Sequence, residues 1–98
     1  MTIEIKRNAE ETIIKLVGRL DTTTAPALDK TIVEDIAGTK NLVLDVKELE
    51  YISGAGLRAF LGAQKRMQKI GSMKVTNLRE EVMEVFEMTG FAEILTIA

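Results

Sequence analysis

The chain has 98 residues and contains no cysteine and no histidine. This composition excludes disulfides, thiolate or imidazole metal ligands and a histidine-based catalytic pair. The formal net charge is -2 and 46% of the residues are hydrophobic, values typical of a compact globular protein. We therefore expect a single domain over residues 1–98 that is not an enzyme and that uses no cofactor and no metal.

The chain also lacks the patterns of two further classes of protein. Residues 1–6 do not show the basic and then apolar pattern of a secretory signal, and no apolar run approaches membrane-spanning length. One tyrosine and three phenylalanines are spread along the chain and form no platform on which bases would stack. We expect a cytoplasmic protein without membrane insertion and without a nucleic-acid ligand.

Two antiparallel strands open the predicted fold. Residues 3–5 alternate between apolar and polar side chains, and residues 12–17 form a β-branched, apolar run. A helix follows, because the threonines at 22–24 supply an N-cap and Pro26 fits the first turn. We expect this helix to run to about Ala37.

Strands and helices alternate through the middle of the chain. Residues 42–44 are continuously apolar, which is typical of a central strand covered on both faces. A helix is predicted from about Gly54 to Lys69, and residues 73–76 predict the next strand.

The last third of the chain predicts one more helix and one more strand. Asn77 is a candidate cap for this helix, and the apolar residues within 82–86 give it an inner stripe. Gly90 suits the left-handed residue after the helix, and residues 94–97 are predicted to add a short edge strand. The predicted order of elements is ββαβαβαβ.

Strand-helix-strand units pair their strands in parallel through right-handed crossovers. We therefore expect an α/β fold with a mixed, mostly parallel β-sheet and helices packed against it. Ligand-binding loops of such folds lie at the carboxyl ends of the parallel strands. The loop after the third strand, residues 51–58, contains Ser53 and several small residues that leave the amides of the helix start open to an anion or a partner surface.

Three segments resemble the STAS family, the domain shared by sulphate transporters and bacterial anti-sigma factor antagonists. The resemblance covers nearly the whole chain and implies a STAS-like fold. The segments are Gly18-Arg19-Leu20-Asp21 through Thr24-Ala25-Pro26, Leu42-Val43-Leu44-Asp45 to the Ser53-to-Leu57 turn, and Val85-Phe86-Glu87-Met88-Thr89-Gly90-Phe91.

This chain is short and shows no transmembrane segment, and in this respect it is similar to the antagonist branch of the family. The resemblance implies binding to an anti-sigma factor that is also a serine kinase, and this binding frees the sigma factor. It further implies that the kinase phosphorylates a serine in the loop before helix two, which releases the antagonist, and that a metal-dependent serine phosphatase restores it. The alternative is a STAS-like adaptor subunit of a larger signalling or transporter-associated complex that is not phosphorylated.

The family places its phosphorylated serine two residues before a Gly-Leu pair, and that position is Gly54 here. Ser53 stands one place earlier and is a candidate phosphorylation site or a helix N-cap. Asp21 resembles an acidic residue of the family's first loop that helps to engage the kinase, and it is equally a candidate cap for the helix that follows it. The predicted partner-binding residues are Asp21, Thr22, Thr23, Ser53, Gly54, Ala55, Gly56, Arg58, Ala59 and Gly62.

The second predicted helix lies in a basic part of the chain. Residues 51–79 contain no acid and carry Arg58, Lys65, Arg66, Lys69, Lys74 and Arg79. Small residues lie along one side of this helix, namely Ala55, Ala59, Gly62 and Ala63. Against the sheet they are ordinary packing, whereas on the outer face they make a smooth, basic-rimmed docking surface for an acidic partner.

Overall fold

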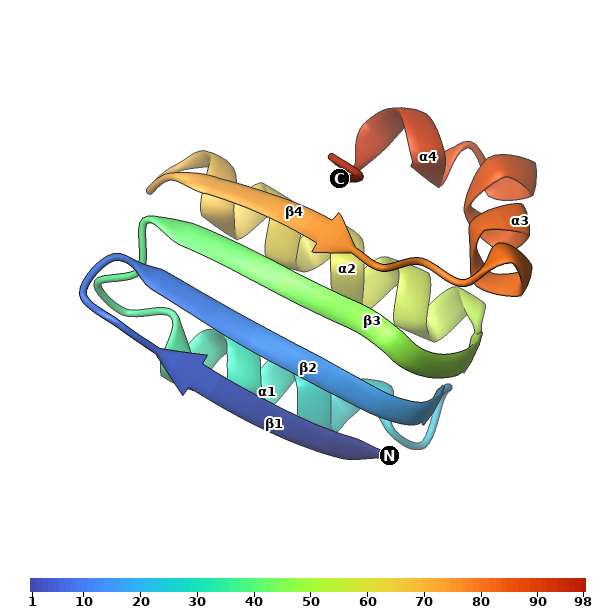
Figure 1. The fold of residues 1–98 in the computed structure, drawn as a ribbon, viewed down its shortest axis with the longest axis horizontal. Coiled ribbons are helices and arrows are strands. Elements are labelled where there is room, and N and C mark those ends of the chain that lie inside the picture. Colours follow the sequence, from blue (N-terminus) through green and yellow to red (C-terminus); the bar gives the residue numbers. More distant parts are fainter.

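A computed structural model describes residues 1–98, with one four-stranded sheet in the order β1-β2-β3-β4 (Figure 1). β1 (Thr2–Arg7) pairs antiparallel with β2 (Glu11–Leu20). β3 (Asn41–Ile52) pairs in parallel with β2 on one side and with β4 (Ser72–Thr76) on the other. The predicted α/β fold with a mixed, mostly parallel sheet is confirmed.

The connecting helices α1 (Ala25–Asp35) and α2 (Gly54–Gln68) cover one face of this sheet (Figure 1). α3 (Glu80–Thr89) and α4 (Phe91–Ile94) lie at the end of the sheet to which β4 leads. The ring of Phe60 on α2 meets that of Phe86 on α3 edge-on, with centroids 5.9 Å apart. This contact joins the C-terminal helices to the same apolar core.

Alternating side chains of the central strands build that core. Ile14 and Leu16 of β2 and Leu42 and Leu44 of β3 are completely buried beneath the helices. Successive side chains of a strand point to opposite faces, so the residues between them point to the face that no helix covers. On that face Val43 is itself buried, with 7% exposure, which explains why the apolar run at 42–44 is continuous.

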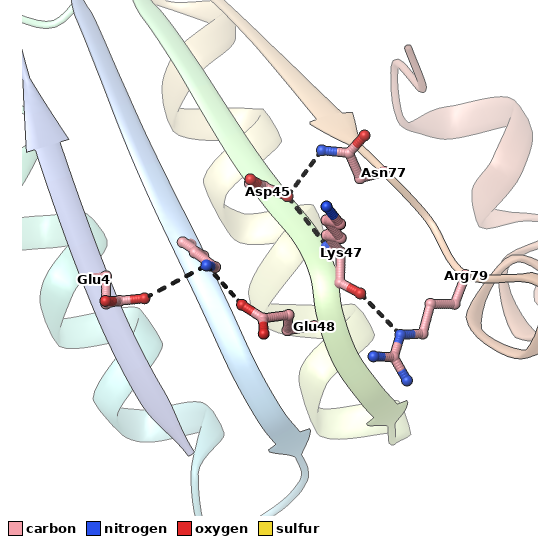
Figure 2. A network of polar contacts seen from close by, with 7 residues as sticks. Glu4, Asp45, Lys47, Glu48, Asn77 and Arg79 are labelled. Carbon is pink, nitrogen blue, oxygen red and sulfur yellow. Dashed lines mark hydrogen bonds and ion pairs between the residues drawn. The ribbon is translucent and has the colours of Figure 1, made fainter.

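The uncovered face carries polar contacts that link β1, β2 and β3 with the segment after β4 (Figure 2). Lys15 on β2 forms an ion pair of 2.6 Å with Glu48 and a longer one of 3.9 Å with Glu4. The hydrogen bond and the charge of Glu48 raise the pKa of Lys15, and Lys15 in turn lowers the pKa of the Glu48 carboxyl. Further along the face, Asn77 donates to Asp45 at 3.0 Å.

β3 is longer than the sequence predicts. Its parallel pairing with β2 shifts register twice, between Lys15 and Val17 and between Gly18 and Arg19. Such bulges let a strand continue through a stretch whose polar pattern does not alternate regularly. Residues 47–51, mostly polar but with Leu49 completely buried, therefore remain in the strand.

The C-terminal segment also differs from the sequence prediction. A strand over 94–97 is wrong, because α4 occupies residues 91–94 and only Ile97 forms a parallel bridge, with Val75. The left-handed Gly90, with φ 80°, turns the chain directly from α3 into α4 and leaves too few residues for a strand. The observed order is ββαβαβαα.

Asn77 does not cap α3. Its own backbone is left-handed, with φ 61°, and its side chain bonds Asp45 instead. The N-cap position belongs to Arg79, whose Nε donates to the carbonyl of Lys47 at 2.8 Å. No helix of the chain combines the length and the apolar character that crossing a membrane requires.

Candidate functional site

The loops that follow β2 and β3 lie side by side at one end of the sheet. The parallel register places Leu20, the last residue of β2, opposite Ile52, the last residue of β3. The main-chain N–H of Ser53 donates to the carbonyl of Leu20 at 2.9 Å. The structure therefore brings the predicted residues of the two loops together, as expected for the carboxyl ends of parallel strands.

Ser53 occupies the N-cap position of α2. Its backbone is extended, and its Oγ accepts a hydrogen bond of 3.4 Å from the N–H of Gly56. The side chain is half-buried, and its hydroxyl donates to no acceptor within the chain. The capping role is thus present, and the hydroxyl proton remains free for another partner.

Gly54 is exposed and its backbone does not require glycine. No left-handed φ occurs there, and a Cβ added at this position lies 3.5 Å from Nη1 of Arg58, an ordinary contact distance. A side chain at 54 thus projects beside a guanidinium and at the positive end of the α2 dipole. Both groups favour an anion at this point.

Gly56, in contrast, is fixed by packing. A Cβ added there lies 2.7 Å from Cγ1 of Ile52 and 2.8 Å from Cγ of Leu20. Neither neighbour is the far end of a flexible side chain, so any larger residue pushes the start of α2 away from the strand ends. The close approach of α2 to the sheet depends on this glycine.

The small residues along α2 divide between its two faces. Ala59 and Ala63 are buried against the core, with 4% and 1% exposure, whereas Gly62 is exposed and Ala55 is half-buried. Ala59 and Gly56 can therefore affect partner binding only indirectly, because they set the position of the helix. Direct contact is open to the outward residues of the helix.

Those outward residues form one stripe along α2, which we call the α2 stripe. Its members share exposure and spacings of three or four residues, the period of a helix face: Gly54, Arg58, Gly62, Lys65, Arg66 and Lys69. None of its cations takes part in an ion pair, because both ion pairs of the chain are made by Lys15. The half of the stripe near the loop contains its two glycines and Arg58. The far half contains three cations, Lys65, Arg66 and Lys69.

At that far end the stripe borders a shallow groove of about 500 Å³. Ile36 after α1 and Ile70 after α2 contribute its apolar part, and cations of the stripe contribute its rim. No group of three or more His, Cys, Asp or Glu side chains is placed to hold a metal ion. The surface offers binding to an acidic, partly apolar segment.

Asp21 organises the loop after β2. Its Oδ1 accepts from the hydroxyl of Thr23 at 2.7 Å, from the N–H of Thr23 at 2.9 Å and from the N–H of Thr24 at 3.2 Å. The hydroxyl bond from Thr23, followed by its main-chain bond, lowers the pKa of the Asp21 carboxyl. Oδ2 makes no hydrogen bond within the chain, so one oxygen is left for a partner.

Two features of this end of the sheet were not indicated by the sequence. The predicted threonine cap is found in position only: Thr24 stands at the N-cap of α1 but makes no side-chain capping bond, and its hydroxyl donates instead to the carbonyl of Arg19 at 2.9 Å. The guanidinium of Arg19 lies over the ring of Tyr51, 4.2 Å from its centroid. The first contact is local to the turn after β2, whereas the second crosses from β2 to β3, whose register pairs Arg19 with Tyr51.

Comparison with known proteins connects this architecture to one family. The sequence profile of the STAS domain matches residues 2–98. The anti-sigma-B factor antagonist of Bacillus subtilis is 28% identical over 99 residues, covering 100% of this chain and 91% of that protein. The anti-sigma-B factor antagonist of Listeria monocytogenes is 30% identical over 100 residues, covering 99% of this chain and 88% of that protein.

Solved structures share the fold. The anti-sigma factor antagonist SpoIIAA in its unphosphorylated form superposes with a TM-score of 0.85 at 18% identity, over 99% of this chain and 88% of that chain. Bacillus SpoIIAA in the phosphorylated form gives a TM-score of 0.77 at 18% identity, over 99% of this chain and 91% of that chain. At this level of identity the likeness is one of fold alone.

Proposed function

The chain belongs to the STAS domain family, and we propose that it acts as an anti-sigma factor antagonist. In this role it binds an anti-sigma factor with serine kinase activity and thereby frees the sigma factor. The observation that carries the proposal is the match over nearly the full length of relatives named anti-sigma-B factor antagonists. The antagonists of this family are regulatory binding modules and not enzymes.

The proposed docking surface consists of the loop after β2, the loop after β3 and the α2 stripe. The bond from Ser53 to Leu20 fixes the two loops to each other, so they present one preformed surface. Thr22, Gly54 and Arg58 are exposed on it. The unpaired cations of the stripe favour a partner with an acidic face, since complementary charge steers association and penalises basic competitors.

The regulatory part of the proposal concerns position 54. A phosphoserine adds about -1.5 to -2 charges at neutral pH, which a helix start with a nearby arginine tolerates. A partner surface pressed against the same point does not, because burial of an uncompensated charge is costly. With Gly54 at this position, we propose that the chain stays competent for binding where a phosphorylatable relative would be released.

Ser53 remains the one serine of this loop and the candidate acceptor of the chain itself. Its hydroxyl proton is free, which supports this role, whereas its partial burial and its capping bond oppose it. A serine phosphatase of the metal-dependent type is a partner only if Ser53 is phosphorylated. Intact mass after incubation with the cognate kinase, ATP and magnesium decides this point.

The test of the proposed function is capture of partners from native lysate, with and without ATP and magnesium. We expect the chain to retain an anti-sigma factor of the kinase class in both conditions. The matched control is Arg58→Glu, which reverses one exposed charge of the α2 stripe and is expected to abolish capture without unfolding the domain. Absence of an anti-sigma factor among the retained proteins would refute the proposal.

Gly54 also favours a second candidate function. A chain without an acceptor at 54 also suits a constitutive STAS-like adaptor subunit of a larger signalling or transporter-associated complex. The capture experiment separates the two. Retention of a multi-subunit assembly, and not of a kinase, would favour the adaptor.

A further inference from the structure

β1 is an edge strand whose outer side is unpaired. It pairs only with β2, in a register that runs without interruption from Thr2↔Val17 to Arg7↔Thr12. At the hairpin, the N–H of Asn8 donates to the carbonyl of Glu11 at 3.0 Å. An unpaired strand edge of this kind is a template for a further strand.

The direction of the free main-chain groups follows from this register. Hydrogen-bonded and non-hydrogen-bonded pairs alternate along an antiparallel ladder. Counting back from the bonded pair at Asn8, the even-numbered residues of β1 direct their N–H and C=O groups to β2. Ile3, Ile5 and Arg7 therefore direct theirs to the free edge.

The side chains of β1 make this edge self-complementary. Glu4 and Lys6 flank Ile5 and share the sheet face that no helix covers, where both border the same shallow hollow. In an antiparallel pairing of two copies centred on Ile5, Glu4 of each copy stands opposite Lys6 of the other. These are non-hydrogen-bonded pairs, in which side chains approach most closely and opposite charges stabilise the pairing.

Other registers lose this match. An antiparallel pairing centred on Ile3 places Glu4 opposite Thr2, and one centred on Arg7 places Lys6 opposite Asn8. Only the pairing centred on Ile5 also packs the two Ile5 side chains against each other. In the single chain this side chain is 38% exposed. The charge pattern thus selects one register and one two-fold axis.

We propose that two copies of this chain associate through their β1 strands, antiparallel and centred on Ile5, so that the two sheets become continuous. The partner is a second copy because the complementarity lies within one segment, Glu4-Ile5-Lys6. β1 and α2 lie on opposite sides of the molecule (Figure 1). The pairing therefore leaves the α2 stripe free.

The contact consists of one short strand from each copy, so its area lies at the low end of specific interfaces. We expect a weak, concentration-dependent dimer. Sedimentation of the whole chain from about 10 µM to about 1 mM covers the range of affinities typical of such contacts. A rise in molar mass toward that of two chains is the expected result, and a chain that stays monomeric to about 1 mM would overturn the proposal.

Charge exchange tests the register. K6E places like charges opposite each other twice because of the two-fold axis, and we expect the dissociation constant to rise about tenfold or more. The double variant E4K/K6E restores both pairs and should recover association. Association of K6E as strong as that of the unaltered chain would overturn the proposed register.

Hydrogen exchange on the unaltered chain gives an answer that does not depend on the folding of any variant. We expect the amides of Ile3, Ile5 and Arg7 to exchange more slowly at high than at low protein concentration. The amides of Glu4 and Lys6, already bonded to β2, should not respond. Exchange of Ile5 that is the same at both concentrations would overturn the proposal.

Discussion

The main-chain N–H of Ser53 bonds the carbonyl of Leu20 at 2.9 Å and holds the loop after β3 against the end of β2. The anchor uses backbone atoms only, so it does not depend on which side chain stands at position 53 or 54. A substitution at position 54 therefore changes the chemistry of the loop without moving it. Position 54 is therefore suited to a direct test of the proposal that the chain lacks the phosphate acceptor.

Gly54→Ser is expected to restore phosphorylation and ATP-dependent release. The added Cβ meets only the end of Arg58, at 3.5 Å, so the variant should fold with a stability within about 0.5 kcal/mol of the parent. The new hydroxyl lies at the helix start, where a phosphate is stabilised. Intact mass and retention on the captured kinase, with ATP and magnesium, measure the two effects.

Gly54→Ala is the matched control for that experiment. It adds the same Cβ without a hydroxyl and should bind the kinase without release. If Gly54→Ser binds but acquires no phosphate from an active cognate kinase, position 54 is not an acceptor site in this fold, and the proposed reason for constitutive binding is wrong.

Gly56→Ala is expected to destabilise the domain by about 1–3 kcal/mol, because the new Cβ overpacks the contact of α2 with Leu20 and Ile52. Gly62→Ala, on the exposed side of the same helix with nothing within 4 Å, should instead stabilise it by up to about 1 kcal/mol. Urea unfolding of both variants measures these shifts. Equal effects of the two substitutions would contradict the packing assigned to Gly56.

Thr23→Ala is expected to raise the pKa of the Asp21 carboxyl toward its ordinary value of 3.8, because it removes the hydroxyl bond that lowers it most. A lowered pKa in the folded state stabilises the fold above the unfolded pKa, and that stabilisation is lost as the pH falls through the folded pKa. The stability difference between parent and variant should therefore shrink from neutral pH to below pH 3.8.

Carboxyl carbon NMR titration measures the pKa of Asp21 directly. Thr22→Ala is the control, since the side chain of Thr22 makes no bond to Asp21. An identical titration of Asp21 in the parent and in Thr23→Ala would show that the Thr23 hydroxyl does not hold the carboxylate.

Gln64→Met is expected to stabilise the domain by about 1 kcal/mol. Oε1 of Gln64 is buried without a hydrogen-bond partner, and an unsatisfied polar atom costs about 1–3 kcal/mol relative to solvent. Methionine has a similar length and no such atom. Chemical unfolding measures the gain, and the exposed Gln68→Met should change stability by less than about 0.5 kcal/mol.

The sequence predicted most of the fold because local periodicity and sheet topology agreed. The apolar strand at 42–44 and the helix that begins at Gly54 fixed a parallel crossover, and the crossover fixed the place of the loop with Ser53. The failures lie where tertiary contacts decide. Residues 94–97 have strand-like composition, but the turn at Gly90 and the packing of α4 determine their path.

The site was predictable in position and less so in detail. The sequence could not separate the two faces of α2, because Ala59 and Gly62 are both small and only the helix orientation buries one and exposes the other. It also left the role of Asp21 open. The structure shows that its carboxylate orders the loop through one oxygen and keeps the other free.

The two edges of the sheet differ in a way that limits how many copies can join. At β4, the N–H of Val75 donates to the carbonyl of Thr96 and the carbonyl of Val75 accepts from the N–H of Ala98, so the C-terminal segment covers that edge at Val75. The chain itself thus interrupts the edge at β4, whereas the edge at β1 remains open along its whole length. If two copies pair through β1 as proposed, the interrupted edge at β4 disfavours further strand addition, and we expect assembly to stop at two copies.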